Sequence, residues 1–220
     1  MAPVPKPVTL RMVLVALAAA GCLCCRTGGA DDRPAIVQPG VPGESSREIT
    51  VEKAVDLSHV QATADDVRFM QGMIGHHQQA VEMTELLATR TNSDAMRKIG
   101  QRIEISQADE IGMMRHWLTA RGQAVPDPHA MHMHGATLMP GMLAQDEMDR
   151  LAAAKGQAFD RLFLEGMIKH HGGALTMVEE LFSHAGAAQE SEMFMFASDV
   201  DADQRAEIAR MSALLEEIEK

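Results

Sequence analysis

The sequence has few aromatic residues, and its thiols are confined to its first part. Phe, Trp and Tyr make up 3 % of the 220 residues, and tyrosine is absent. Strands of a β-sandwich are usually rich in aromatic side chains, so this composition argues against that fold. The cysteines are Cys22, Cys24 and Cys25, so the later part of the chain can form neither a disulfide nor a thiolate metal site. A metal bound there must use histidine, methionine, carboxylate or backbone ligands.

The motifs of several common catalytic sites are also missing. The sequence contains no Glu-x-x-His, no H-E-x-x-H, no G-x-S-x-G and no Walker A pattern. These absences argue against a di-iron carboxylate bundle, a zinc protease, a serine hydrolase and a nucleotide-binding enzyme. We therefore predict that the protein is not an enzyme.

Excess positive charge and long apolar runs are absent as well. The net charge is −11 and the isoelectric point is near 5.3, which argues against nucleic acid and against an electrostatic attraction to anionic lipid. The apolar run from Met12 to Ala20 is too short to cross a membrane as a helix. Because it follows Lys6 and Arg11 and ends in small residues, it is typical of an export signal, which we predict over residues 1–21.

The end of this signal predicts a lipid anchor. The stretch Ala19-Ala20-Gly21-Cys22 is similar to a bacterial lipobox, in which the cysteine is lipidated after cleavage. We expect Cys22 to attach the protein to a membrane, in the periplasm, at the outer membrane or at the cell surface. Residues 22–60 are predicted as a flexible tether, because much of this stretch is rich in Gly, Pro and polar residues without apolar periodicity. We expect a short helix within residues 49–60 and no strand anywhere in the chain.

The strongest feature that the sequence does contain is an internal repeat. Residues 66–87 and 160–181 share eleven identities in 22 positions at a constant offset of 94, including a His-His pair in each copy. The pattern Q-x-x-E-I-x-x-M also occurs twice, over residues 107–114 and 204–211. Two helix pairs from one duplicated hairpin predict an all-α four-helix bundle over residues 61–220. The first repeat covers 63–122, a His/Met-rich connector covers 123–143, and the second repeat covers 144–220.

Capping and helix-breaking residues predict where the helices begin and end. Thr63 is a plausible N-cap with acidic residues after it, and Ser93 caps the next long helix. The expected helices run from Thr63 to about Thr89, from Ser93 to Gly122, over 144–154, over 157–184 before Gly186, and from Glu190 to the C-terminus.

Each His-His helix carries a heptad stripe of apolar residues that also contains a histidine. In the first copy the stripe is Phe69, Met73, His76, Ala80, Met83 and Leu87, and the adjacent His77 is expected at its edge. Imidazole and thioether groups together suit copper(I). In the alternative interpretation, each histidine of the stripe bonds a carboxylate or a carbonyl across the bundle. The candidate metal ligands are Met73, His76, His77, Met83, Met167, His170, His171 and Met177.

The connector holds a second set of candidate ligands. His129, Met131, His132, Met133 and His134 alternate in a segment with Pro and Gly, and Met139 and Met142 follow. No apolar period is present, so we expect metal binding rather than core packing to explain these methionines, although a biased linker without function would look the same. We expect His116 and His184 at the surface or at a helix end.

The His-His motif resembles that of a known family. The first copy reads F-M-x-G-M-I-x-H-H-x-x-A-x-x-M, and the second copy differs from this pattern only by Leu164 in place of Met70. Both copies resemble the bacterial domain of unknown function 305 family, and the resemblance covers about Thr63 to the C-terminus. It implies a ferritin-like four-helix bundle, export from the cytoplasm, and a metal-handling role for the eight His and Met residues of the two motifs, since the family includes periplasmic copper-binding proteins tied to copper tolerance.

These observations predict an exported protein that binds copper(I), or silver(I), for sequestration, tolerance or transfer. A homodimer and a copper-handling partner protein are compatible with that function. Two other functions remain open on the sequence alone. One is a small metal-dependent oxidase, and the other is a structural or signalling lipoprotein whose histidines only pack or sense pH.

Overall fold

The computed structural model describes residues 34–38, 45–56, 60–127 and 138–220. The chain divides between Val55 and Asp56 into two compact units. Within the described residues, no helix is long and apolar enough to cross a membrane.

The first unit contains a short antiparallel hairpin, so the expectation of no strand is wrong. Strand β1 (Ile36–Gln38) pairs with β2 (Arg47–Ile49), and Arg47 Nε donates to Gln38 Oε1 at 2.8 Å. Helix α1 (Val51–Ala54) follows, with its first turn capped by the Thr50 hydroxyl. Strands of three residues are too short for an alternating pattern to stand out, although the Pro- and Gly-rich stretch between them is typical of a turn.

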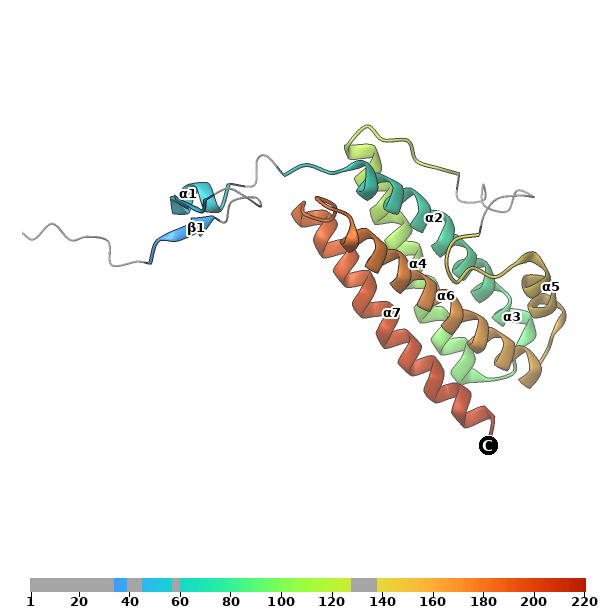
Figure 1. Cartoon of the computed structure of the whole chain (residues 1–220). Helices are drawn as coiled ribbons and strands as arrows, with labels where there is room; N and C mark the ends of the chain where they lie inside the picture. The colour runs from blue at the N-terminus through green and yellow to red at the C-terminus, as the bar shows by residue number, and fades with distance from the viewer. Residues whose placement is uncertain (1–33, 39–44, 57–59, 128–137) are drawn as a thin grey trace, which may run out of the picture. The chain divides into compact units, whose positions relative to one another are not determined.

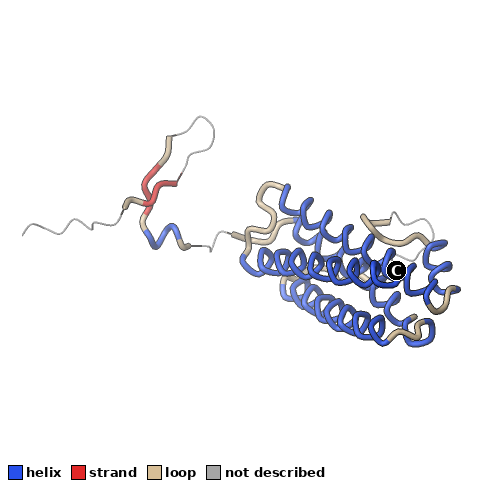
Figure 2. Tube along the Cα trace, turned by 90° about the horizontal axis from the view of Figure 1, so that it is seen from below, coloured by secondary structure: helices blue, strands red, loops and turns tan. Residues whose placement is uncertain are grey.

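The second unit is a bundle of four long helices, which confirms the predicted fold class. Figures 1 and 2 show these helices side by side, with α2 (Ala64–Glu85) packed on α4 (Asp94–Ala120), α6 (Gln157–Ser183) packed on α7 (Ser191–Ile218), and α2 lying against α6. The unit also contains two shorter helices, α3 (Leu87–Arg90) and α5 (Gln145–Ala153). Each end lies within a few residues of the position expected from the capping residues, except that the first long helix is divided into α2 and α3.

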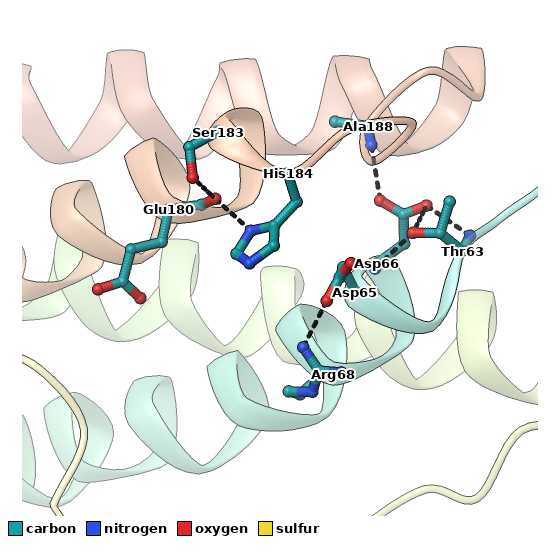
Figure 3. A network of polar contacts seen from close by, with 8 residues as sticks. All are labelled: Thr63, Asp65, Asp66, Arg68, Glu180, Ser183, His184 and Ala188. Atoms are coloured by element: carbon teal, nitrogen blue, oxygen red, sulfur yellow. Dashed lines mark hydrogen bonds and ion pairs between the residues drawn. The ribbon is translucent and has the colours of Figure 1, made fainter.

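Asp66 fixes the start of α2 to the other hairpin. Its carboxylate accepts a hydrogen bond from the Thr63 backbone N at 2.7 Å, while the Thr63 hydroxyl accepts one from the Asp66 backbone N, which completes a capping box. The second oxygen of Asp66 accepts from the Ala188 backbone N at 2.7 Å (Figure 3). Ala188 lies in the α6–α7 connection with a φ of 53°, so this bond stabilises a conformation that alanine rarely adopts.

A polar layer divides the interior of the bundle into two hydrophobic clusters. On α2, Met73 belongs to the first cluster and Met83 to the second, with His76 and His77 between them. Each of the other three long helices also contributes residues to both clusters and has buried polar residues between them. The layer consists of His76, His77, Gln107, Glu110, His170, His171, Gln204 and Glu207.

A strap formed by residues 138–144 passes close over α6. The Gln79 side chain holds it on α2 by accepting from the Leu143 backbone N at 2.7 Å and donating to the Leu143 carbonyl at 2.9 Å. Gly141 has a φ of 75°, and a Cβ on Gly173 would lie 1.9 Å from the Pro140 carbonyl oxygen. Only a glycine at position 173 leaves room for the strap in this place.

The strap therefore predicts opposite effects for two neighbouring glycines. Gly173→Ala should lower the free energy of unfolding by about 1–3 kcal/mol, because the new methyl group overlaps the strap backbone. Gly172→Ala is the matched control, since no atom lies within 4 Å of the position that its Cβ would take. It should raise the free energy of unfolding by about 0.5–1 kcal/mol, as alanine does in a helix interior. Urea unfolding followed by far-UV circular dichroism measures both, and equal effects would contradict the strap contact.

Candidate metal centre

The four histidines of the repeat lie in one row inside the bundle. His76 and His77 come from α2, His170 and His171 come from α6, and none is more than 1 % exposed. The His76 and His170 rings are neighbours, with centroids 3.9 Å apart, and each lies 6.2 Å from the histidine that follows it in the sequence. The row therefore runs from His77 through His76 and His170 to His171.

The outer two histidines are paired with glutamates from the partner helices. His77 Nε2 lies 2.5 Å from Glu110 Oε2 of α4, and His171 Nε2 lies 2.6 Å from Glu207 Oε2 of α7. The sequence places His77 and His171 at the edge of the stripe, and the structure shows that this edge is also buried, because α4 and α7 cover that flank of the two His-His helices. The glutamates were not among the predicted site residues, although the Q-x-x-E pattern that repeats in both partner helices marks their positions.

The inner two histidines donate to backbone carbonyls. His76 Nε2 donates to the Pro140 oxygen of the strap at 2.9 Å, and His170 Nε2 donates to the His76 oxygen at 3.0 Å. A carbonyl oxygen can only accept, so the proton of each ring must be on Nε2. The sequence left open whether these histidines bind metal or form hydrogen bonds to a carboxylate or carbonyl across the bundle. The structure shows that Nε2 of each inner histidine forms a hydrogen bond to a carbonyl.

The other ring nitrogen, Nδ1, forms no hydrogen bond to a described residue in any of the four histidines. Within the described part of the chain, no hydrogen-bond partner lies near Nδ1 of His76, His77, His170 or His171. Burial, together with the neighbouring His77, lowers the pKa of His76 to about 3, and burial lowers the pKa of His170 well below its ordinary value. Both inner rings are therefore neutral at pH 7, and each presents an unprotonated Nδ1 with a free lone pair.

The predicted methionine ligands lie on both sides of the histidine row. Met73 and Met177 belong to the first hydrophobic cluster, whereas Met83 and Met167 belong to the second. The two methionines of one repeat are therefore separated by the polar layer, and each shares a cluster with a methionine of the other repeat. This arrangement follows from the antiparallel packing of two copies, and it puts thioether groups from both repeats on each side of the imidazoles.

Imidazoles and carboxylates alone do not complete a metal site in the described residues. There, no three or more His, Cys, Asp or Glu side chains are arranged so that they could hold one ion together. A site in this layer would have to add thioether sulfur to the histidine nitrogens. That mixture of soft and borderline donors suits copper(I) and does not suit magnesium or calcium.

The remaining predicted residues fall into different parts of the chain. Cys22 and the connector ligands His129, Met131, His132, Met133 and His134 lie outside the described residues. Met142 is only 3 % exposed, so the expectation that core packing does not explain the connector methionines is wrong for this residue. His116 is exposed, and His184 ends α6 with its Nδ1–H donating to the Glu180 carbonyl at 2.6 Å, as predicted for a helix end.

Known proteins with this architecture include metal-bound ones. The family described as Domain of unknown function (DUF305) matches residues 66–215. The chain is similar to the solved structure of a DUF305 protein from Streptomyces coelicolor that is predicted to be secreted, with 30 % identity and a TM-score of 0.61, over 71 % of this chain and 96 % of that one. It is also similar to CopM in its copper(I)-bound form, with 28 % identity and a TM-score of 0.54, over 71 % of this chain and 98 % of CopM.

CopM structures also exist with copper(II) and with silver bound. A curated relative, the uncharacterized protein L153 of Acanthamoeba polyphaga mimivirus, is 36 % identical over 61 residues, or 28 % of this chain. The chain spans 40 % of the length of that viral relative.

The buried neutral histidines predict a loss of stability in acid. In the unfolded chain a histidine binds a proton below about pH 6.5, whereas folded His76 does so only near pH 3. The free energy of unfolding should therefore fall as the pH drops through this window, by about 1.4 kcal/mol per pH unit for each such histidine. Urea unfolding between pH 7 and pH 4 measures the slope, which should be shallower in His76→Gln and His170→Gln. The exposed His116→Gln is the control, and a flat profile in the parent protein would contradict the assignment.

Proposed function

This chain belongs to the DUF305 family, and on that basis we propose that it is an exported cell-envelope protein that binds copper(I) and silver(I) through histidine and methionine ligands. Its role is to sequester the metal, for tolerance or for transfer to a partner, and not to catalyse a reaction. In this proposal the signal over residues 1–21 directs export and is then removed. The lipid anchor on Cys22 and the tether over residues 22–60 hold the bundle at a membrane surface outside the cytoplasm. The CopM structures with copper and silver support the choice of metal.

One observation carries this proposal: four buried imidazoles each have Nε2 on an acceptor and Nδ1 without a partner among the described residues. In protein metal sites, a ligating histidine usually donates its other N–H to a carboxylate or a backbone carbonyl, which fixes the ring and its tautomer. Glu110 and Glu207 do this for the outer rings, and Pro140 and His76 supply the carbonyls for the inner rings. A polar atom without a partner in this interior is costly, and a bound metal would satisfy it.

The thioethers complete the donor set. Met73 and Met177 lie on one side of the histidine row, and Met83 and Met167 lie on the other. We therefore propose two related positions, one on each side of the row, at which Nδ1 and sulfur donors bind the metal together. Thioethers do not titrate, and the inner histidines stay neutral well below pH 7, so protons compete weakly with copper(I) for these ligands.

Anaerobic copper(I) titration against a chromogenic chelator tests the proposal on the purified protein. The parent should bind copper(I) tightly. His76→Gln with His170→Gln should weaken this binding by more than about 100-fold, because it removes ligands themselves and not only their supporting contacts. His77→Gln with His171→Gln shows which pair of rings matters more, and His116→Gln should bind like the parent.

A variant with His129, Met131, His132, Met133 and His134 replaced separates the layer from the connector. It should keep the tight site. If tight binding disappears in this variant and persists in the layer variants, the connector holds the metal and the histidine layer is a packing element. If the parent binds no copper(I), the interpretation as a structural or signalling lipoprotein is favoured instead.

The glutamate contacts generate a separate prediction. Glu110→Gln removes the charge that accepts from His77 while keeping an oxygen at that place. It should lower the copper(I) affinity by about 10–100-fold without changing the number of ions bound, as changes behind a ligating histidine do. The exposed Glu104→Gln on the same helix is the control. An unchanged affinity would show that His77 is not a ligand.

A further inference from the structure

A cavity of about 240 Å³ opens between the first turns of α2, the last turns of α6 and the strap. Its lining includes two methionines and one histidine, Met139, Met177 and His184. None of the four layer histidines lines it, although it shares Met177 with the donors proposed for the layer. Thioether and imidazole groups in one solvent-connected cavity are the donor types that bind copper(I) and silver(I).

The two methionines meet over a glycine. A Cβ on Gly72 would lie 3.2 Å from Met139 Sδ and 3.6 Å from Met177 Cε, so both thioether ends lie close to the same point on α2. Met177 is 8 % exposed, and Met139 is half-buried against the first hydrophobic cluster. The two side chains therefore lie at the boundary between the core and the cavity, where a metal ion could reach them from solvent.

His184 presents a free nitrogen at the same cavity. Its Nδ1–H donates to the Glu180 carbonyl, so Nε2 is the ring nitrogen left for a metal ion. Figure 3 shows the imidazole extending from the end of α6 toward the first turns of α2. A ligating histidine held by a backbone carbonyl through its other nitrogen is the usual arrangement in metal sites.

The second repeat provides an internal comparison. Gly166 corresponds to Gly72, and a Cβ there would meet Met83 Cε at 3.3 Å and Leu143 Cδ2 at 3.1 Å. The position that corresponds to His184 at the offset of 94 is Arg90. At this equivalent place the second repeat therefore keeps one methionine, Met83, but has Leu143 in the place of Met139 and Arg90 in the place of His184.

We propose that Met139, Met177 and His184 form a second, solvent-accessible site for copper(I) or silver(I), which receives the ion before the buried layer binds it. The proposal rests on the proposed function for the identity of the metal. Met177 shares its cluster with Met73, and Pro140, next to Met139, accepts the hydrogen bond of His76. The surface site and the layer are thus adjacent through the strap.

Silver(I) titration of the protein with ¹³C-labelled methionine methyl groups tests this site, because silver(I) does not change oxidation state in air. In the parent, the Met139 and Met177 methyl resonances should shift on binding. In the double variant Met139→Leu with His184→Gln, the Met177 methyl resonance should no longer show the shift that the surface ion causes. The number of silver(I) ions bound per chain should fall by one. Leucine should be tolerated at position 139, because a leucine, Leu143, already packs over the equivalent Gly166. Circular dichroism verifies that the variant folds.

The controls separate this proposal from the function of the layer. Met195→Leu removes an exposed methionine, 62 % accessible, and should leave the shifts and the stoichiometry unchanged. In His76→Gln with His170→Gln, the surface ion should still bind and shift Met139. If Met139→Leu with His184→Gln binds as many ions as the parent, the surface site does not exist, whereas the proposed function stands. If the parent binds neither copper(I) nor silver(I), both fail.

Discussion

The constraint on which the rest of the structure depends is the burial of four imidazoles in the middle of a helical bundle. A polar ring in such an interior needs partners, and the fold supplies one to Nε2 of each ring. Glu110 and Glu207 reach in from α4 and α7, while the strap and the α2 backbone supply carbonyls. The strap brings the Pro140 carbonyl to His76, and the absence of a side chain at Gly173 leaves room for it.

The same layer determines how the hydrophobic core is arranged. It divides the core into two clusters, and antiparallel packing of the duplicated hairpins brings methionines of different repeats into the same cluster. Flexible thioether side chains can fill the irregular space beside the polar layer. They also place soft donors beside His76 and His170, which burial keeps neutral, so packing and the proposed metal chemistry use the same side chains.

The two copies have kept the layer and diverged around it. Both retain a His-His pair and a glutamate partner, yet Met139 and His184 at one side correspond to Leu143 and Arg90 at the other. Asp66 bonds the Ala188 backbone, whereas one oxygen of its counterpart Asp160 has no partner among the described residues. A duplicated fold needs the central contacts twice, but it leaves the surface around each copy free to change.

The sequence by itself determined the helices, the duplicated bundle and the eight His and Met candidates, because heptad spacing, caps and a constant offset are local or repeated signals. The strands β1 and β2 were too short to give such a signal. Only the tertiary structure decided that His77 and His171 are buried, that Glu110 and Glu207 are their partners, and that Met142 is core. These facts depend on which helix covers which flank and on where the strap crosses, and a one-dimensional pattern contains neither.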